Sequence, residues 1–297
     1  MTAQVTTVKK APTSNRRQLS ASALKLLAAI VTALTLLVSA VYSIAEEIKP
    51  KRAIVSIIID DIGYSLHSGQ SVIDIPHNLT LAIIPFTPYG KQLATIAHQS
   101  QREIMLHAPM ETLSTDKWEQ SLNTLMGKDE FTTLLQQMLL DIPYVSGLNN
   151  HGGSKLTQDR QRMNWLMLSL ARHQLYFVDS RTTAETQAST AAAQAAIPHH
   201  DRDIFLDNNR DTTAIIKQLD KLLALALREG QAIGIGHPYP ETIQALTQKL
   251  PEFRQKQVEI VKVSALRATP KHRILDRVEL SESQRKNIQN DQKTYGN

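Results

Sequence analysis

The sequence of 297 residues contains no cysteine, few large aromatic residues and no basic surplus outside its amino terminus. The lack of cysteine excludes disulfide staples, and a chain of this length with 42% hydrophobic residues can bury a large core without them. Five Phe and two Trp are too few to predict an aromatic sugar-binding surface. Residues 1–25 hold five basic and no acidic residues, which accounts for the whole net charge of +5. A basic groove for nucleic acid is therefore not expected in the folded part.

The basic residues 1–25 precede an uncharged run, LLAAIVTALTLLVSAVYSIA, at residues 26–45. This pattern predicts either a cleaved signal peptide, with small-x-small sites at VSA and SIA, or an uncleaved inner-membrane anchor. In both cases the basic leader is expected to stay cytoplasmic and the rest to be exported to the periplasm or cell envelope. The charged residues 266–297 are expected to form a flexible tail or an exposed helix.

Between these ends, short apolar runs alternate with amphipathic stretches that are typical of helices, such as residues 131–142, 160–173 and 212–230. Strands that are apolar on both faces and separated by helices predict a parallel sheet. About eight such units favour an α/β fold over residues 51–265, a distorted parallel β/α barrel rather than a doubly wound sheet. The predicted strands are 53–59, 79–85, 103–109, 144–150, 175–180, 203–207, 231–237 and 257–263.

Polar residues follow the carboxyl ends of five of these strands, which is the face that carries the active site in β/α folds. Each has a plain structural interpretation when taken singly, such as a helix cap, a core histidine or a turn. Their shared position favours a functional site instead. They are Asp60 and Asp61, His107, Asn149 to His151, Asp179 with Ser180, and His237.

Histidines and carboxylates in this arrangement are suited to zinc or a similar divalent ion. His107 and Glu111 are four residues apart, and with Asp61 and His151 they form the predicted ligand set. Asp60 would then remain as the base toward a water held by the metal, and would share the catalysis with a general acid. His237 is the expected acid, protonating a leaving amine.

The motifs IVSIIIDDIGY, LHAPME, LNNHGGS, FVDSRTT, RDIFLDN and IGHP, in this order, resemble the divergent polysaccharide deacetylase family of bacterial envelope proteins. The resemblance covers about residues 52–265. It implies a distorted β/α barrel with Asp60 as base, Asp61 and His107 as metal ligands, and His237 as acid. Glu111 stands where ordinary deacetylases have a second histidine, and their Arg-x-Pro-Tyr segment is absent.

The residues NNHGGS occupy the position in the chain where the Arg-x-Pro-Tyr segment would lie. Their backbone amides, or the side chain of Asn150, are therefore candidates for oxyanion stabilisation. Asp179 and Ser180 are assigned to substrate contacts or to support of the site. The segment HHDRD at residues 199–203 is interpreted as a solvated loop.

Two functions follow from these residues. The first is a metal-dependent hydrolase that removes acetyl groups from an N-acetylated envelope glycan such as peptidoglycan. The second is a non-catalytic protein that retains the barrel and binds glycan or an envelope partner. The presence of both Asp60 and His237 favours the enzyme.

Overall fold

The structure is a computed structural model, and it describes residues 21–47, 52–114 and 120–267. The chain divides into two units, Met1–Lys51 and Arg52–Asn297. In the first unit, helix α1 (Ala21–Glu47) contains the apolar run. Within the described ranges, no helix has the length and apolar character needed to cross a membrane. The export role of residues 26–45 stays a prediction, and most of the predicted leader and tail lies outside the described residues.

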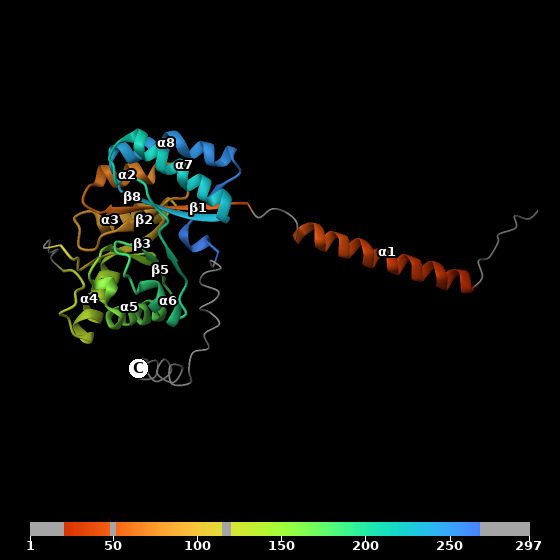
Figure 1. Cartoon of the computed structure of the whole chain (residues 1–297), viewed down its shortest axis with the longest axis horizontal. Helices are drawn as coiled ribbons and strands as arrows, with labels where there is room; N and C mark the ends of the chain where they lie inside the picture. The colour runs from red at the N-terminus through yellow and green to blue at the C-terminus, as the bar shows by residue number, and fades with distance from the viewer. Residues whose placement is uncertain (1–20, 48–51, 115–119, 268–297) are drawn as a thin grey trace, which may run out of the picture. The chain divides into compact units, whose positions relative to one another are not determined.

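The described part of the second unit forms one parallel sheet in the spatial order β6-β5-β4-β3-β2-β1-β8-β7, with β9 beside β1 (Figure 1). Each of the eight predicted strands has a counterpart in this sheet. The strands are β1 (Ile54–Ile62), β2 (Thr80–Ile83), β3 (Glu103–Met110), β4 (Val145–Gly152), β5 (Tyr176–Asp179), β6 (His199–Asp201), β7 (Ile204–Phe205), β8 (Gln231–Gly236) and β9 (Glu259–Ile260).

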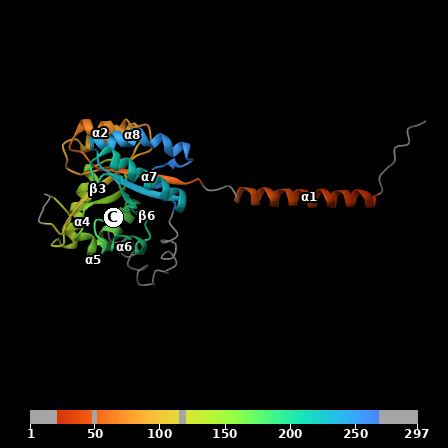
Figure 2. The same cartoon turned by 45° about the horizontal axis from the view of Figure 1, so that its top comes forward.

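Helices cover the outside of the curled sheet. Figures 1 and 2 show α2, α7 and α8 on one side of the strands and α4, α5 and α6 on the other. Side-chain caps begin several of them: Asp159 accepts from the backbone N–H of Arg162 at the start of α5, and Asp211 accepts from that of Ala214 at the start of α7. The helices are α2 (Leu66–Ile73), α3 (Gly90–Gln99), α4 (Lys128–Asp141), α5 (Arg160–Arg172), α6 (Ala188–Gln194), α7 (Thr212–Glu229) and α8 (Pro240–Gln255).

The inside of the sheet holds a second, smaller apolar cluster. Ile58, Met105 and Ile235 belong to it, whereas their neighbours Ile57 and Ile59 pack in the larger cluster with the helices. This alternation gives strands with two apolar faces, as the sequence predicts. A short 3₁₀ helix, Val263–Ala265, contacts the starts of β2 and β3 and covers the amino end of the interior. The candidate functional residues lie at the opposite end of the interior, at the carboxyl ends of the strands.

The two edge strands of the sheet, β6 and β7, are joined by only two residues. The backbone N–H of Arg202 donates to Asp179 of β5 (2.9 Å), and that of Asp203 donates to Ile233 of β8 (3.0 Å). Arg202 and Asp203 therefore bridge the seam, which is the place where the edge strands β6 and β7 do not pair with each other. The predicted distorted β/α barrel is therefore confirmed.

The segment HHDRD is not the solvated loop that the sequence suggests. Its first three residues form β6, and the side chains of His199 and His200 are each only 6% exposed. A three-residue edge strand of polar residues carries no apolar alternation, so the sequence pattern could not identify it.

Candidate metal centre

The carboxylates of the adjacent residues Asp60 and Asp61 both lie near His107 because the end of β1 is irregular. In a regular strand the side chains of Asp60 and Asp61 would point to opposite faces. Asp61 instead has a φ of 58°, and the pairing of β1 with β2 shifts register between Ile59 and Ile62. Oδ2 of Asp60 and Oδ1 of Asp61 consequently lie 3.6 and 3.3 Å from the same atom, Nε2 of His107.

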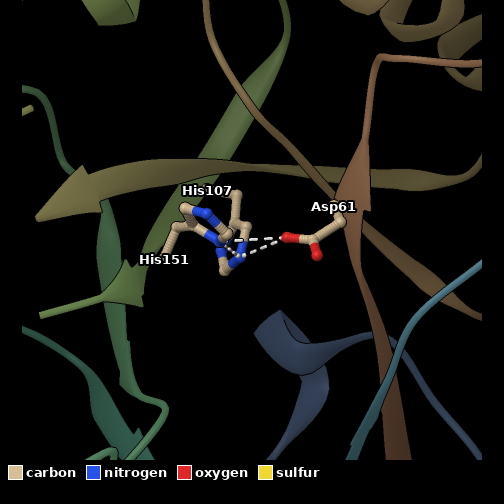
Figure 3. A group of neighbouring side chains, drawn as sticks. All are labelled: Asp61, His107 and His151. Atoms are coloured by element: carbon tan, nitrogen blue, oxygen red, sulfur yellow. Dashed lines mark hydrogen bonds and ion pairs between the residues drawn. The ribbon is translucent and has the colours of Figure 1, made fainter. Parts of the chain in front are cut away.

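Asp61, His107 and His151 converge from β1, β3 and β4 (Figure 3). Oδ1 of Asp61 lies 3.3 Å from Nε2 of His107 and 3.0 Å from Nδ1 of His151, and the two nitrogens are 3.1 Å apart. Three tetrahedral ligands of zinc, each about 2.0–2.1 Å from the ion, would be separated by roughly 3.3 Å. The triangle of donor atoms therefore has the size that a tetrahedral ion requires.

The electrostatics of the three residues also fit a cation. Oδ1 of Asp61 is buried and makes no hydrogen bond of ordinary geometry. Burial opposes ionisation of this carboxyl, but its contacts with His107 and His151 outweigh that effect and lower its pKa. Burial likewise opposes protonation of His107, yet the charges of Asp60 and Asp61 raise its pKa. An anionic oxygen facing two imidazoles is a donor set suited to a divalent ion.

Asn149 of β4 connects a candidate ligand to the candidate base. Its Oδ1 lies 2.8 Å from Nδ1 of His107, and its Nδ2 donates to Oδ1 of Asp60 at 2.8 Å. Because the amide nitrogen is committed to Asp60, its oxygen accepts the Nδ1 proton of His107. This hydrogen bond occupies Nδ1, so Nε2, beside Asp61 and His151, is the nitrogen of His107 that is available to a cation.

The candidate base Asp60 is buried, with 2% of its surface exposed. Burial raises its pKa, while the neighbouring His107 and His237 lower it in part. A carboxyl group with a raised pKa, next to a candidate cation site, is suited to accept a proton near neutral pH.

His237 follows β8 and faces the group from the other side, with its Nε2 3.8 Å from Oδ2 of Asp61. Its Nδ1 bonds to Oδ1 of Asp207 (2.9 Å), and Oδ2 of Asp207 accepts from the His237 backbone and from Thr242. Burial opposes protonation of His237, but the hydrogen bond and charge of Asp207 raise its pKa to about 9. The imidazole is therefore protonated at neutral pH, with its Nε2–H toward the site.

Glu111, a predicted ligand, is not in the group of residues that the structure brings together. Its Oε2 accepts from the backbone and hydroxyl of Thr124, and its Oε1 accepts from Lys155 at 2.7 Å. Since β3 ends at Met110, the four-residue spacing from His107 does not place Glu111 on the same face. Its carboxylate instead holds residues 120–125 and Lys155 beside the site, and His151 supplies the third donor atom.

The three predicted substrate contacts are buried and bonded within the protein. The amide of Asn150 donates to Gly152 and accepts from the backbone of Ser180. Asp179 accepts from the Arg181 backbone and the Thr186 hydroxyl, and burial raises its pKa. The hydroxyl of Ser180 lies 3.3 Å from the amide of Asn149. These side chains support the neighbouring loops, and none of the three belongs to the group of donor atoms.

The model of the divergent polysaccharide deacetylase family matches residues 57–267, which is more than half of the chain. The chain belongs to this family. An uncharacterized protein of Escherichia coli K12, YibQ, is 36% identical over 216 residues, covering 72% of this chain and 67% of that protein. An uncharacterized protein of Haemophilus influenzae is 34% identical over 201 residues, covering 66% and 72% of the two chains.

Among solved structures similar to this chain, an uncharacterized protein of Agrobacterium tumefaciens C58 is 25% identical. It has a TM-score of 0.71 and is matched over 74% of this chain and 91% of its own. The resemblance read from the sequence motifs is thus confirmed, together with the fold that it implies.

The sequence placed Asn149 at a strand end without giving it a role, and it did not single out Asp207. Asn149 stands directly beside Asn150 and His151, and three consecutive polar residues do not reveal which of them points inward. Asp207 ends the weak predicted strand 203–207, so the rule that finds polar residues at strand ends would have found it as well.

Proposed function

We propose that the protein is a metal-dependent hydrolase that removes acetyl groups from an N-acetylated glycan of the cell envelope. The observation that carries this proposal is the triangle formed by Asp61, His107 and His151 with a buried carboxyl and a protonated imidazole beside it. The family description names polysaccharide deacetylation, and an ion, a base and an acid together can catalyse the hydrolysis of an amide.

Asp61, His107 and His151 would hold the ion, and their two nitrogens and one oxygen suit zinc. When bound, such an ion polarises a carbonyl and lowers the pKa of water at the site. Asn149 fixes the orientation of His107, so the ligand is preorganised before the ion arrives. Three protein ligands leave a coordination position for the reaction.

Asp60 is the proposed base. It accepts a proton from the attacking water through the oxygen that is not bonded to Asn149. Its burial keeps this carboxyl out of bulk solvent, and the amide of Asn149 prevents it from rotating away.

His237 is the proposed acid. The Asp207 carboxylate holds its Nδ1–H, so the proton available for transfer is on Nε2, which faces the site. It passes to the nitrogen of the leaving amine when the bond between carbonyl carbon and nitrogen breaks. The substrate loses acetate, and the sugar retains a free amine.

The proposed location follows from the sequence alone. The basic leader and the apolar residues 26–45 support export to the periplasm or envelope, where peptidoglycan-like substrates lie. We include this location in the proposal, together with membrane attachment if the apolar segment is retained.

The proposal is tested by measuring metal content and acetate release on the whole chain. Wild type is expected to contain nearly stoichiometric zinc and to release acetate from chitin oligosaccharides, and a chelator should abolish the activity until zinc is returned. Asp61→Ala should lose both metal and activity. Asp211→Ala, which removes an aspartate that caps α7, is the matched control and should retain both.

The results separate the two candidate functions. Full zinc content with no acetate release from N-acetylated glycans or small amides would refute the hydrolase and favour a non-catalytic, glycan-binding role. If the wild type binds no zinc or other divalent ion, the mechanism itself is refuted.

A further inference from the structure

Nine described residues other than glycine have a positive φ, and all of them except Gln120 fall into two groups. Five of them, Gln101, Tyr144, Gln174, Ala196 and Gln257, follow a helix and precede a strand, where a left-handed residue commonly ends the helix. Asp61 instead lies among the last residues of β1, and Phe86 and Arg181 follow β2 and β5, so all three are at the carboxyl ends of strands, where the candidate metal centre lies.

Phe86 is unusual because a bulky side chain rarely adopts this strained backbone conformation. Its φ is 61°, and 43% of its surface is exposed. The backbone N–H of Phe86 donates to the Asp141 carboxylate at 2.7 Å. Pro85 and Pro88 further restrict the loop. The protein thus keeps an apolar residue partly exposed on a loop whose backbone is restrained.

The loop of Phe86 interlocks with the loop that follows the candidate ligand Asp61. The backbone of Tyr89 donates to Gly63 (3.0 Å), and that of Ile84 donates to Ile62 (2.9 Å). A Cβ on Gly63 would lie 2.1 Å from the Thr87 hydroxyl, so the two loops are in direct contact.

Three exposed aromatic side chains stand on these two loops: Tyr64 is 63% exposed, Phe86 43% and Tyr89 38%. Tyr64 is three residues from Asp61, so their Cα atoms are at most about 11 Å apart. The protein has few aromatic residues, yet three exposed ones lie on two contacting loops, one of which begins next to the candidate ligand Asp61. We name Tyr64, Phe86 and Tyr89 the aromatic platform.

We propose that the aromatic platform binds sugar rings of the glycan that neighbour the residue being deacetylated, so that the protein prefers an extended chain over a single sugar. This inference rests on the proposed function and specifies its substrate. Pyranose rings have apolar C–H faces and a polar rim, and an exposed aromatic ring buries such a face while the hydroxyl groups stay in water. The fixed loop lowers the entropy lost on binding.

The test is equilibrium binding of a chitin hexamer to the whole chain, measured by titration calorimetry so that no catalysis is needed. Tyr64→Ala and Phe86→Ala are each expected to weaken binding about tenfold, the change that follows when a ring face of about 60 Å² is lost from the contact. Tyr144→Ala is the matched control. It removes another exposed aromatic residue at positive φ (66°, 52% exposed), which lies between α4 and β4 at the opposite end of the strands.

Weaker binding in the two platform variants with unchanged binding in Tyr144→Ala supports the proposal. Equal affinity in all four proteins would overturn it, as would a wild type that binds the hexamer no better than N-acetylglucosamine. Metal content and acetate release from a single N-acetylated sugar are measured separately, so either result leaves the hydrolase to be judged on its own data.

Discussion

Replacing Asn149 by alanine should weaken metal binding although Asn149 is not a ligand. The variant loses the 2.8 Å hydrogen bonds to Nδ1 of His107 and to Oδ1 of Asp60. Loss of the outer partner of a ligating histidine typically lowers metal affinity about 10–100-fold, or about 1.4–2.7 kcal/mol. The buried Asp60 also loses a donor, which should lower the free energy of unfolding by about 1–3 kcal/mol.

Zinc affinity is measured by competition with a chromophoric chelator, and stability by denaturant unfolding of the metal-free protein. Asn150→Ala is the matched control, since Asn150 is equally buried but bonds only to the backbone of Gly152 and Ser180. It should lose stability and keep its zinc affinity. If Asn149→Ala binds zinc as tightly as the wild type, or if both variants lose affinity equally, the reasoning is wrong.

Three further predictions concern other parts of the site. Asp207→Asn should lower the pKa of His237 from about 9. Because the general acid must be protonated, the alkaline limb of the pH–activity profile should move to lower pH. An unchanged limb would exclude His237 as the general acid. Glu111→Gln should retain metal in elemental analysis whereas His151→Ala should lose it, and the reverse result would restore the ligand set read from the sequence. Gly63→Ala, at a φ of 136° and with no room for a Cβ, should lower the free energy of unfolding by about 1–3 kcal/mol, which denaturant titration would detect.

The barrel could be predicted from the sequence because its strands are apolar on both faces, a pattern that few other arrangements produce. The same reading placed Asp60, Asp61, His107, His151 and His237 at the carboxyl ends of strands, and the structure brings these five together. That result depends on topology alone, since parallel strands bring their carboxyl ends to one edge.

The finer assignments needed information that spacing does not contain. The positions of Glu111 and His151 relative to His107 depend on where β3 ends and how β4 is registered beside it, and in that register His107 pairs with Asn149. A single-residue change of register exchanges the inward and outward side chains. The roles of Asn149 and Asn150 therefore became clear only from the three-dimensional structure.

The seam between β6 and β7 also bears on how the protein avoids aggregation. A sheet that does not close by strand pairing has two edges, and an exposed edge can recruit a strand from another molecule. Here the edges are strands of three and two residues, and the Arg202–Asp203 link crosses directly between them. So few unpaired backbone groups offer little template for intermolecular pairing. An incompletely closed barrel can thus present little free strand edge without the hydrogen bonds that full closure would provide.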